Sequence, residues 1–200
     1  MQPNCKLIST DKKCQNKKPI SYCSSKNITV NSSDLAFLVD DYFKEYENSY
    51  EEEDKWWGEK NVTWEEVLKR GWQSRFENGK MHSHQRRVAH KLDEGLEVSL
   101  SDNIQPNRFN DFHSVYSWIK SVTDRVKGLG NTTAYDVARR LGVWVGVHPI
   151  MVYLHAGAAT GAKKLGVEGK IVSLNDFPLE IQKLGATHAE NFLCIYKNFL

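Results

Sequence analysis

The sequence predicts an all-α fold, a compact multi-helix bundle, and three observations carry this prediction. Large apolar residues recur at helical spacing in several segments, which marks the buried face of an amphipathic helix. Helix-capping patterns stand in front of two such segments. No segment alternates apolar and polar residues between hairpin turns, as a half-buried strand would. With 40% hydrophobic and 11% aromatic residues, the chain can bury a substantial core.

Four helices are expected in the first part of the chain. The first begins at Ser33 and runs into the acidic stretch 50–60, YEEEDKWWGEK, which is either a solvated helix end or a loop. The second follows a capping box at 63–66, TWEE, in which the hydroxyl and the carboxylate each satisfy an unpaired amide. Residues 83–95 and 110–124 form the next two. The second helix carries an aromatic stripe that we interpret as core, made of Trp64, Leu68, Trp72 and Phe76.

The remaining helices follow a glycine-rich turn. One begins near Asn131, and the segments 149–154 and 178–184 each form a short helix begun by a proline. A second capping box, 187–190, precedes the last helix. Its expected buried face consists of Phe192, Ile195, Tyr196 and Phe199. The total is seven to nine helices.

Length and composition place the protein among ordinary globular chains. Its 200 residues suit one helical domain, 33–200, after a flexible polar leader, 1–32. Because no apolar run approaches the roughly 20 residues of a membrane span and no secretory signal precedes the domain, we expect a cytoplasmic protein with no membrane partner. We expect no cofactor, and free thiols rather than a zinc site at Cys5, Cys14, Cys23 and Cys194.

The stretch 127–142, KGLGNTTAYDVARRLG, predicts a tight turn between two helices. Glycine tolerates a positive φ and close backbone approach, so Gly128 and Gly130 permit a short link, and Leu129 can fill the space between the helices. The amides of the turn and of the first helical turn have no partner within the helix. Such a turn can bind an anion, including a phosphate oxygen. Because the net charge is only +2, affinity for nucleic acid must come from this local arrangement.

The segment GLGNTTA resembles the G-h-G-x-x-T-A core, where h is apolar, of the helix-hairpin-helix motif of DNA repair and recombination proteins. The resemblance covers about 111–142 and implies a hairpin that grips DNA phosphates without reading sequence. A monovalent cation is often held by hairpin carbonyls in that family, which here implies those of Asp124, Val126 and Leu129. A simple helix–helix corner that needs glycine remains the alternative.

Residues 152–166, VYLHAGAATGAKKLG, look similar to the segment that follows this motif in helix-hairpin-helix DNA glycosylases, which implies a DNA glycosylase-like bundle. Two departures stand out. Tyr153 occupies the place of the catalytic Asp, and Thr132 the place of the Lys that attacks the sugar in bifunctional members. Neither residue can supply that chemistry. Four segments also resemble a set of uncharacterised bacterial proteins, namely H-x-HQRR, YDVARRLG, VYLHAG and LCIYK.

Asp136 and His155 are the candidate catalytic residues. Asp136 is either a general base or a water-orienting carboxylate in a cleft, or a salt-bridge partner of Arg139 or Arg140. His155 precedes the small-residue segment AGAATGA. It lies either in a pocket wall or in the core as a hydrogen-bonded histidine.

Basic side chains outside the turn complete the candidate DNA-binding set. Arg86 and Arg87 suit phosphate contacts, and a metal site built from the nearby His82, His84 and His90 is disfavoured by their spacing. Lys163 and Lys164 can add backbone contacts. We expect a basic strip of Lys127, Arg139, Arg140, Lys163 and Lys164. The full DNA-binding set is Lys127, Gly128, Leu129, Gly130, Asn131, Thr132, Thr133, Arg86, Arg87, Lys163 and Lys164.

Three functions therefore remain in order of preference. The first is binding of the DNA duplex backbone without sequence preference, in DNA repair, modification or defence. The second is a glycosylase-like enzyme that processes DNA bases with non-standard catalytic residues. The third is a helical protein-interaction factor in which the turn is only a corner.

Overall fold

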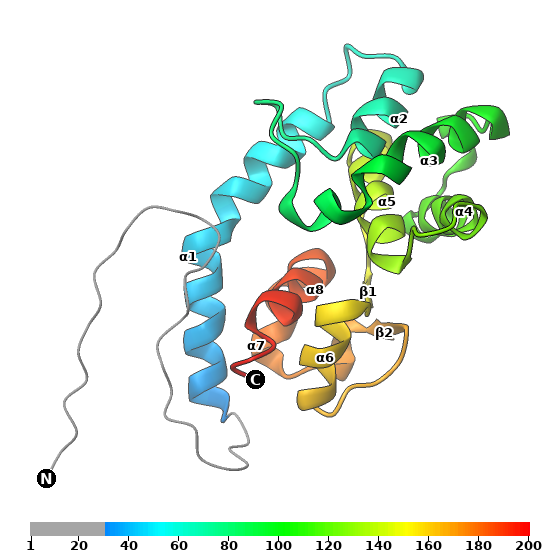
Figure 1. The fold of residues 1–200 in the computed structure, drawn as a ribbon. Coiled ribbons are helices and arrows are strands. Elements are labelled where there is room, and N and C mark those ends of the chain that lie inside the picture. Colours follow the sequence, from blue (N-terminus) through cyan, green and yellow to red (C-terminus); the bar gives the residue numbers. More distant parts are fainter. Residues whose placement is uncertain (1–30) are drawn as a thin grey trace, which may run out of the picture.

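The computed structural model describes residues 31–200 (Figure 1). The expected leader, with Cys5, Cys14 and Cys23, lies almost entirely outside the described residues. Eight α-helices, three short 3-10 helices and one pair of strands make up the described part. In chain order they are α1 (Ser32–Trp57), α2 (Trp64–Gln73), η1 (Ser83–Val88), α3 (Ala89–Asp102), η2 (Pro106–Arg108), α4 (Phe112–Arg125), α5 (Asn131–Val145), β1 (Met151–Tyr153), α6 (Ala156–Lys164), β2 (Ile171–Ser173), η3 (Leu174–Asp176), α7 (Leu179–Gln182) and α8 (Gly185–Tyr196).

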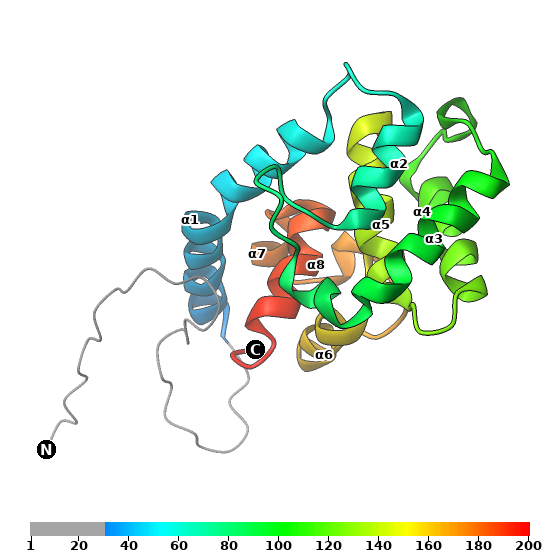
Figure 2. The same cartoon turned by 45° about the horizontal axis from the view of Figure 1, so that its top comes forward.

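Two hydrophobic clusters divide the helices into two lobes. Helices α2, α3, α4 and α5 surround one cluster, which includes Trp72, Ile119 and Leu141. The N-terminal half of α1 packs with α6, α7 and α8 around the other, which includes Tyr42 and Phe192. Helix α1 runs along both lobes, and Figure 2 shows α8 between α1 and the α2–α5 lobe. The lobes therefore meet along α1, α5 and α8.

Most of the expected helices are confirmed, and the open question about the first is answered. The acidic stretch 50–60 is helical as far as Trp57, where α1 ends. Thr63 caps α2, since its hydroxyl accepts a hydrogen bond from the amide of Glu66 at 3.3 Å. Helix α2 ends at Gln73, so Phe76 lies beyond it and stacks on His82 with 3.8 Å between ring centroids.

Two expectations for the C-terminal part are wrong. The segment 149–154 forms no helix, because Met151–Tyr153 pairs antiparallel with Ile171–Ser173, and this pairing places Val152 opposite Val172. The chain is thus mostly helical rather than purely so. The capping box expected at 187–190 does not begin a helix, since α8 already begins at Gly185. Glu190 consequently lies inside α8 and is 7% exposed.

The small residues of α6 pack this helix against α8. Gly161 faces the backbone of Leu193 so closely that an added Cβ would lie inside van der Waals distance of the Leu193 carbonyl. Gly157 faces the side chain of Cys194 in the same way. The segment AGAATGA is therefore a helix-packing surface rather than the wall of a pocket.

Gly161→Ala is expected to lower the free energy of unfolding by about 3 kcal/mol, because overpacking against a rigid backbone forces α6 away from α8. Chemical denaturation measures the effect. The control is Thr160→Ala on the exposed side of the same helix, which we expect to change stability by less than about 0.5 kcal/mol. Equal effects of the two substitutions would contradict this packing.

Candidate functional site

The turn between α4 and α5 is short and anchored at one end. Val126 is buried, whereas Lys127, Gly128 and Gly130 are exposed. Gly128 has a φ of +102°, a value at which a side chain is strained. The amide of Leu129 donates to the Val126 carbonyl at 3.2 Å, and the Leu129 side chain packs against the α2–α5 cluster. The expected turn and the role of its leucine are confirmed.

The first turn of α5 presents three amides without a protein acceptor. Gly130 is the N-cap of this helix and has no side chain to cap it. Ala134 is the first residue whose amide bonds back, to the Gly130 carbonyl at 3.0 Å. Within residues 31–200, neither backbone nor side chain accepts from the amides of Asn131, Thr132 and Thr133. These N–H groups and the positive end of the helix dipole form a site suited to an anion.

Arg86 and Arg87 follow Gln85, the residue that fixes η1 to the start of α5. Gln85 is buried, accepts a hydrogen bond from the Thr133 hydroxyl at 3.2 Å and donates one to Asp136. The two arginines that follow it are exposed.

Lys91, which is not among the residues predicted from the sequence, lies beside the turn. Its Cγ is 3.9 Å from where a Cβ on Gly128 would stand. Lys91 follows Arg87 by four residues, so helical spacing was the signal that could have identified it. Its ammonium group pairs with Glu94 at 2.8 Å.

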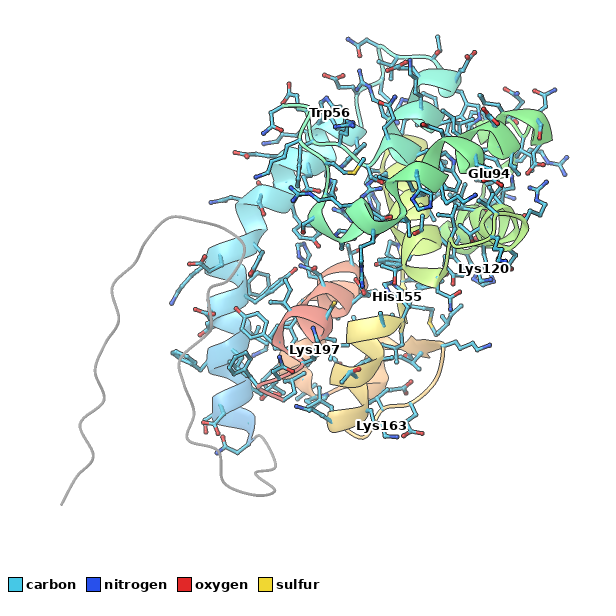
Figure 3. All side chains as sticks on the ribbon, in the orientation of Figure 1. Trp56, Glu94, Lys120, His155, Lys163 and Lys197 are labelled. Carbon is cyan, nitrogen blue, oxygen red and sulfur yellow. The ribbon has the colours of Figure 1, made fainter. Side chains whose placement is uncertain are left out.

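The expected basic strip is wrong in two of its five residues. The guanidinium groups of Arg139 and Arg140 point into the protein, where Arg139 pairs with Asp54 at 2.5 Å and Arg140 donates to the Gly71 carbonyl at 3.1 Å. Lys163 and Lys164 are exposed, but they lie at the end of α6 opposite His155. Figure 3 shows His155 and Lys163 at these two ends.

A polar cavity of about 100 Å³ lies between the two lobes. It is lined by α1, α5, α8 and the segment that enters η1. Tyr135 and His82 are buried, and the Tyr135 hydroxyl and His82 Nε2 have no hydrogen-bond partner. Because unpaired buried polar atoms are costly, the cavity suits a hydrogen-bonding occupant. The exposed His84 and the half-buried Thr187 and Asn191 also line the cavity.

Asp136 lies in this cavity as an ionised carboxylate. It accepts hydrogen bonds from His84 Nε2 at 2.7 Å and from the Gln85 amide group, and it forms no salt bridge with Arg139 or Arg140. Burial raises its pKa, but the His84 hydrogen bond and the positive charge of Arg140 outweigh burial and lower the pKa to about 2. An ionised, oriented carboxylate can accept a proton from water or stabilise a positive charge.

Asp136→Asn is expected to remove about 2 kcal/mol of pH-dependent stability. The pKa of Asp136 is lower in the folded state than its ordinary value of 3.8. The contribution of Asp136 to the free energy of unfolding is therefore complete above about pH 4 and is lost as the pH falls through about 2. Urea unfolding between pH 2 and pH 6 measures this. Asp93→Asn, on the exposed surface of α3, is the control, and identical pH curves for the two variants would contradict the assignment.

His155 is buried and stands between the turn and Glu190. Its Nδ1 is 3.3 Å from the Thr132 hydroxyl, and its Nε2 is 3.4 Å from Glu190 Oε1. Burial lowers the pKa of His155, so the ring is neutral at pH 7. It is held as a core histidine at the margin of the cavity.

Tyr153 and Thr132, the two residues that depart from the glycosylase pattern, both contact histidine side chains within the protein. Tyr153 is buried in the α2–α5 cluster, and its hydroxyl lies 3.0 Å from His113 Nδ1. Thr132 faces His155, as described above.

Among the described residues, the side chains do not form a metal-binding cluster. Across residues 31–200, no group of three or more His, Cys, Asp and Glu side chains is placed to hold a metal ion. The Val126 carbonyl already accepts the Leu129 amide, and a monovalent cation at the carbonyls of Asp124, Val126 and Leu129 stays a prediction. Cys194 is a half-buried free thiol. Among the described helices, none is long and apolar enough to cross a bilayer.

In comparisons with known proteins, no family model, no curated protein and no solved structure matches the chain. We therefore infer the function from the geometry of the turn and of the cavity.

Proposed function

We propose that the protein binds the sugar-phosphate backbone of duplex DNA through the turn between α4 and α5, in the manner of a helix-hairpin-helix and without reading base sequence. The observation that carries the proposal is the set of three amides, at Asn131, Thr132 and Thr133, that have no acceptor within the described protein. Backbone amides at a helix N-terminus match the geometry and charge of a phosphate.

Basic side chains around the turn support the same function. Lys127 lies in the turn, Lys91 beside it, and Arg86 and Arg87 on the neighbouring η1. Together they add positive charge on one side of a molecule whose net charge is only +2. This local charge attracts a phosphate backbone without making the whole protein a polycation.

A salt titration of duplex affinity tests the proposal. If the protein neutralises several phosphates, log K falls linearly with log salt, with a slope of about −0.9 per phosphate contacted. We expect a slope of about −2 to −4 from the basic groups near the turn, and similar affinities for unrelated sequences. A slope near zero, or no binding at low salt, would favour a protein-interaction factor in which the turn is only a corner.

The cavity favours a second candidate function, a DNA base-processing enzyme on a glycosylase-like scaffold. Asp136, ionised in the cavity, is linked to the turn through Gln85 and Thr133. A nucleotide extruded from a bound duplex could thus reach an oriented carboxylate. Incubation with duplexes carrying damaged or modified bases tests this. Wild type should release a base, and Asp136→Asn should release it at least about a hundredfold more slowly.

A further inference from the structure

Two chains of side chains connect the first turn of α5 to two carboxyl groups. Thr133 reaches Asp136 through Gln85. Its neighbour Thr132 reaches Glu190 through His155, with 3.3 Å between Thr132 Oγ1 and His155 Nδ1 and 3.4 Å between His155 Nε2 and Glu190 Oε1. Consecutive residues of the proposed phosphate-binding turn therefore lead to both carboxyl groups of the cavity.

The surroundings of Glu190 favour the opposite protonation state from that of Asp136. It belongs to α8, lines the cavity and forms no hydrogen bond of its side chain with any described residue. Burial raises its pKa well above the ordinary value, the negative charge of Asp136 raises it further, and Arg139 opposes them only in part. These surroundings favour the neutral form of the carboxyl group. The titratable groups around it are Asp136, Arg139, Tyr135, Tyr42, Tyr50, His155 and Cys194.

His155 orients this acid rather than competing with it. Because the ring is buried and neutral, one nitrogen donates and the other accepts. In the tautomer whose Nδ1 donates to the Thr132 hydroxyl, Nε2 is an acceptor that faces Glu190 Oε1 at 3.4 Å and has no hydrogen-bond partner among the described residues. His155 and Thr132 are therefore positioning residues.

We propose that Glu190 is the proton donor of the cavity, with Asp136 as its ionised counterpart and with His155 and Thr132 positioning it. The inference rests on the second candidate function, base processing. Two carboxyl groups whose surroundings hold them in opposite protonation states are the arrangement that acid–base hydrolysis requires.

Hydrolysis of the bond between base and sugar needs water as its only further reactant. The Glu190 O–H bond breaks as the proton moves to a basic nitrogen of the bound nucleobase. The bond from base to sugar breaks, and the departing base takes its electron pair. Water forms the new C–O bond at the sugar, and its proton passes to Asp136. Proton exchange with solvent then returns both carboxyl groups to their initial states.

The test combines a protonation measurement with base release in the full-length protein. Carbon-13 NMR of labelled glutamate, assigned by comparison with Glu190→Gln, should show a carboxyl group that is protonated at pH 7. Glu190→Gln keeps the size of the side chain but has no proton to donate, and it should slow base release from the damaged-duplex panel by about 10²–10⁴-fold with unchanged duplex affinity. The wild-type rate should fall as the pH rises through the raised pKa of Glu190.

The pH dependence of stability distinguishes proton donation by Glu190 from a purely packing role of this residue. Unfolded glutamate ionises above about pH 4.3, whereas native Glu190 stays protonated, so wild-type stability should fall with rising pH relative to Glu190→Gln. Thr132→Ala should lower the pH at which the rate declines, and Thr132→Ser should restore it. An ionised Glu190 at pH 7, or no loss of rate in Glu190→Gln, overturns the proposal. So does the absence of base release by wild type, although duplex binding would then still stand.

Discussion

Gly130→Asp is expected to abolish duplex binding while leaving the fold intact. Gly130 is the N-cap of α5, its φ of −144° is open to any residue, and a Cβ there would meet nothing within 4 Å. An aspartate at an N-cap accepts from the amides two and three residues ahead, here those of Thr132 and Thr133. The substitution would thus occupy the amides proposed to hold a phosphate. Its charge adds repulsion of about 4 kcal/mol at a separation of about 4 Å and an effective dielectric constant of about 20, which corresponds to roughly a thousandfold loss of affinity.

The same substitution should raise the free energy of unfolding by a few tenths of a kcal/mol, because aspartate is the better N-cap and its charge suits the helix dipole. Fluorescence anisotropy with a duplex and denaturant unfolding measure the two effects separately. Gly130→Ala is the matched control, since it adds a Cβ but no acceptor, and it should bind within about threefold of wild type. Undiminished binding by Gly130→Asp would disprove both DNA-based functions.

Arg140→Met is expected to lower the free energy of unfolding by about 3–5 kcal/mol. Arg140 is 4% exposed, donates to the Gly71 carbonyl and to Ser74 Oγ at 3.1 and 2.7 Å, and lies over the ring of Trp57. Methionine fills much of the same volume but leaves these acceptors unpaired. It also removes a positive charge that lowers the pKa of Asp136.

Two further variants separate the effect of the lost hydrogen bonds from the effect of the lost positive charge. Arg140→Lys keeps the charge but not the forked donor geometry, so it should recover part of the stability and most of the low Asp136 pKa. Arg108→Met, at an exposed site on η2, should change stability by less than about 0.5 kcal/mol. Urea unfolding at pH 7 ranks the variants. A loss under about 1 kcal/mol for Arg140→Met would show that this buried cation is not needed for the fold.

The parts of the fold that follow from local chemistry were predictable. Apolar spacing located α4, and Thr63 marked the start of α2. The two glycines at 128 and 130 located the turn, because few other sequences permit a link that short. Each of these signals lies within a few residues of the structure that it determines.

The cavity was not predictable to the same degree, because it depends on residues far apart in the chain. Asp136 stood out as a candidate, but its partners His84 and Gln85 lie about 50 positions earlier, and Glu190 comes from the other lobe. The sequence places Glu190 in a capping box, since the pattern T-x-x-E has the same letters at a helix start and inside α8. It also predicts a helix where the strand 151–153 lies, because the partner strand is about 20 residues away and a three-residue strand is too short to show alternation.

The most direct test of the central claim is amide NMR of the full-length protein during titration with a short duplex. The proposal predicts that the backbone amide resonances of Asn131, Thr132 and Thr133 shift first and furthest, with those of Arg86 and Arg87 following, and that added salt reverses the shifts. If the duplex leaves these three resonances unmoved while it shifts others, the turn between α4 and α5 does not bind the phosphate backbone.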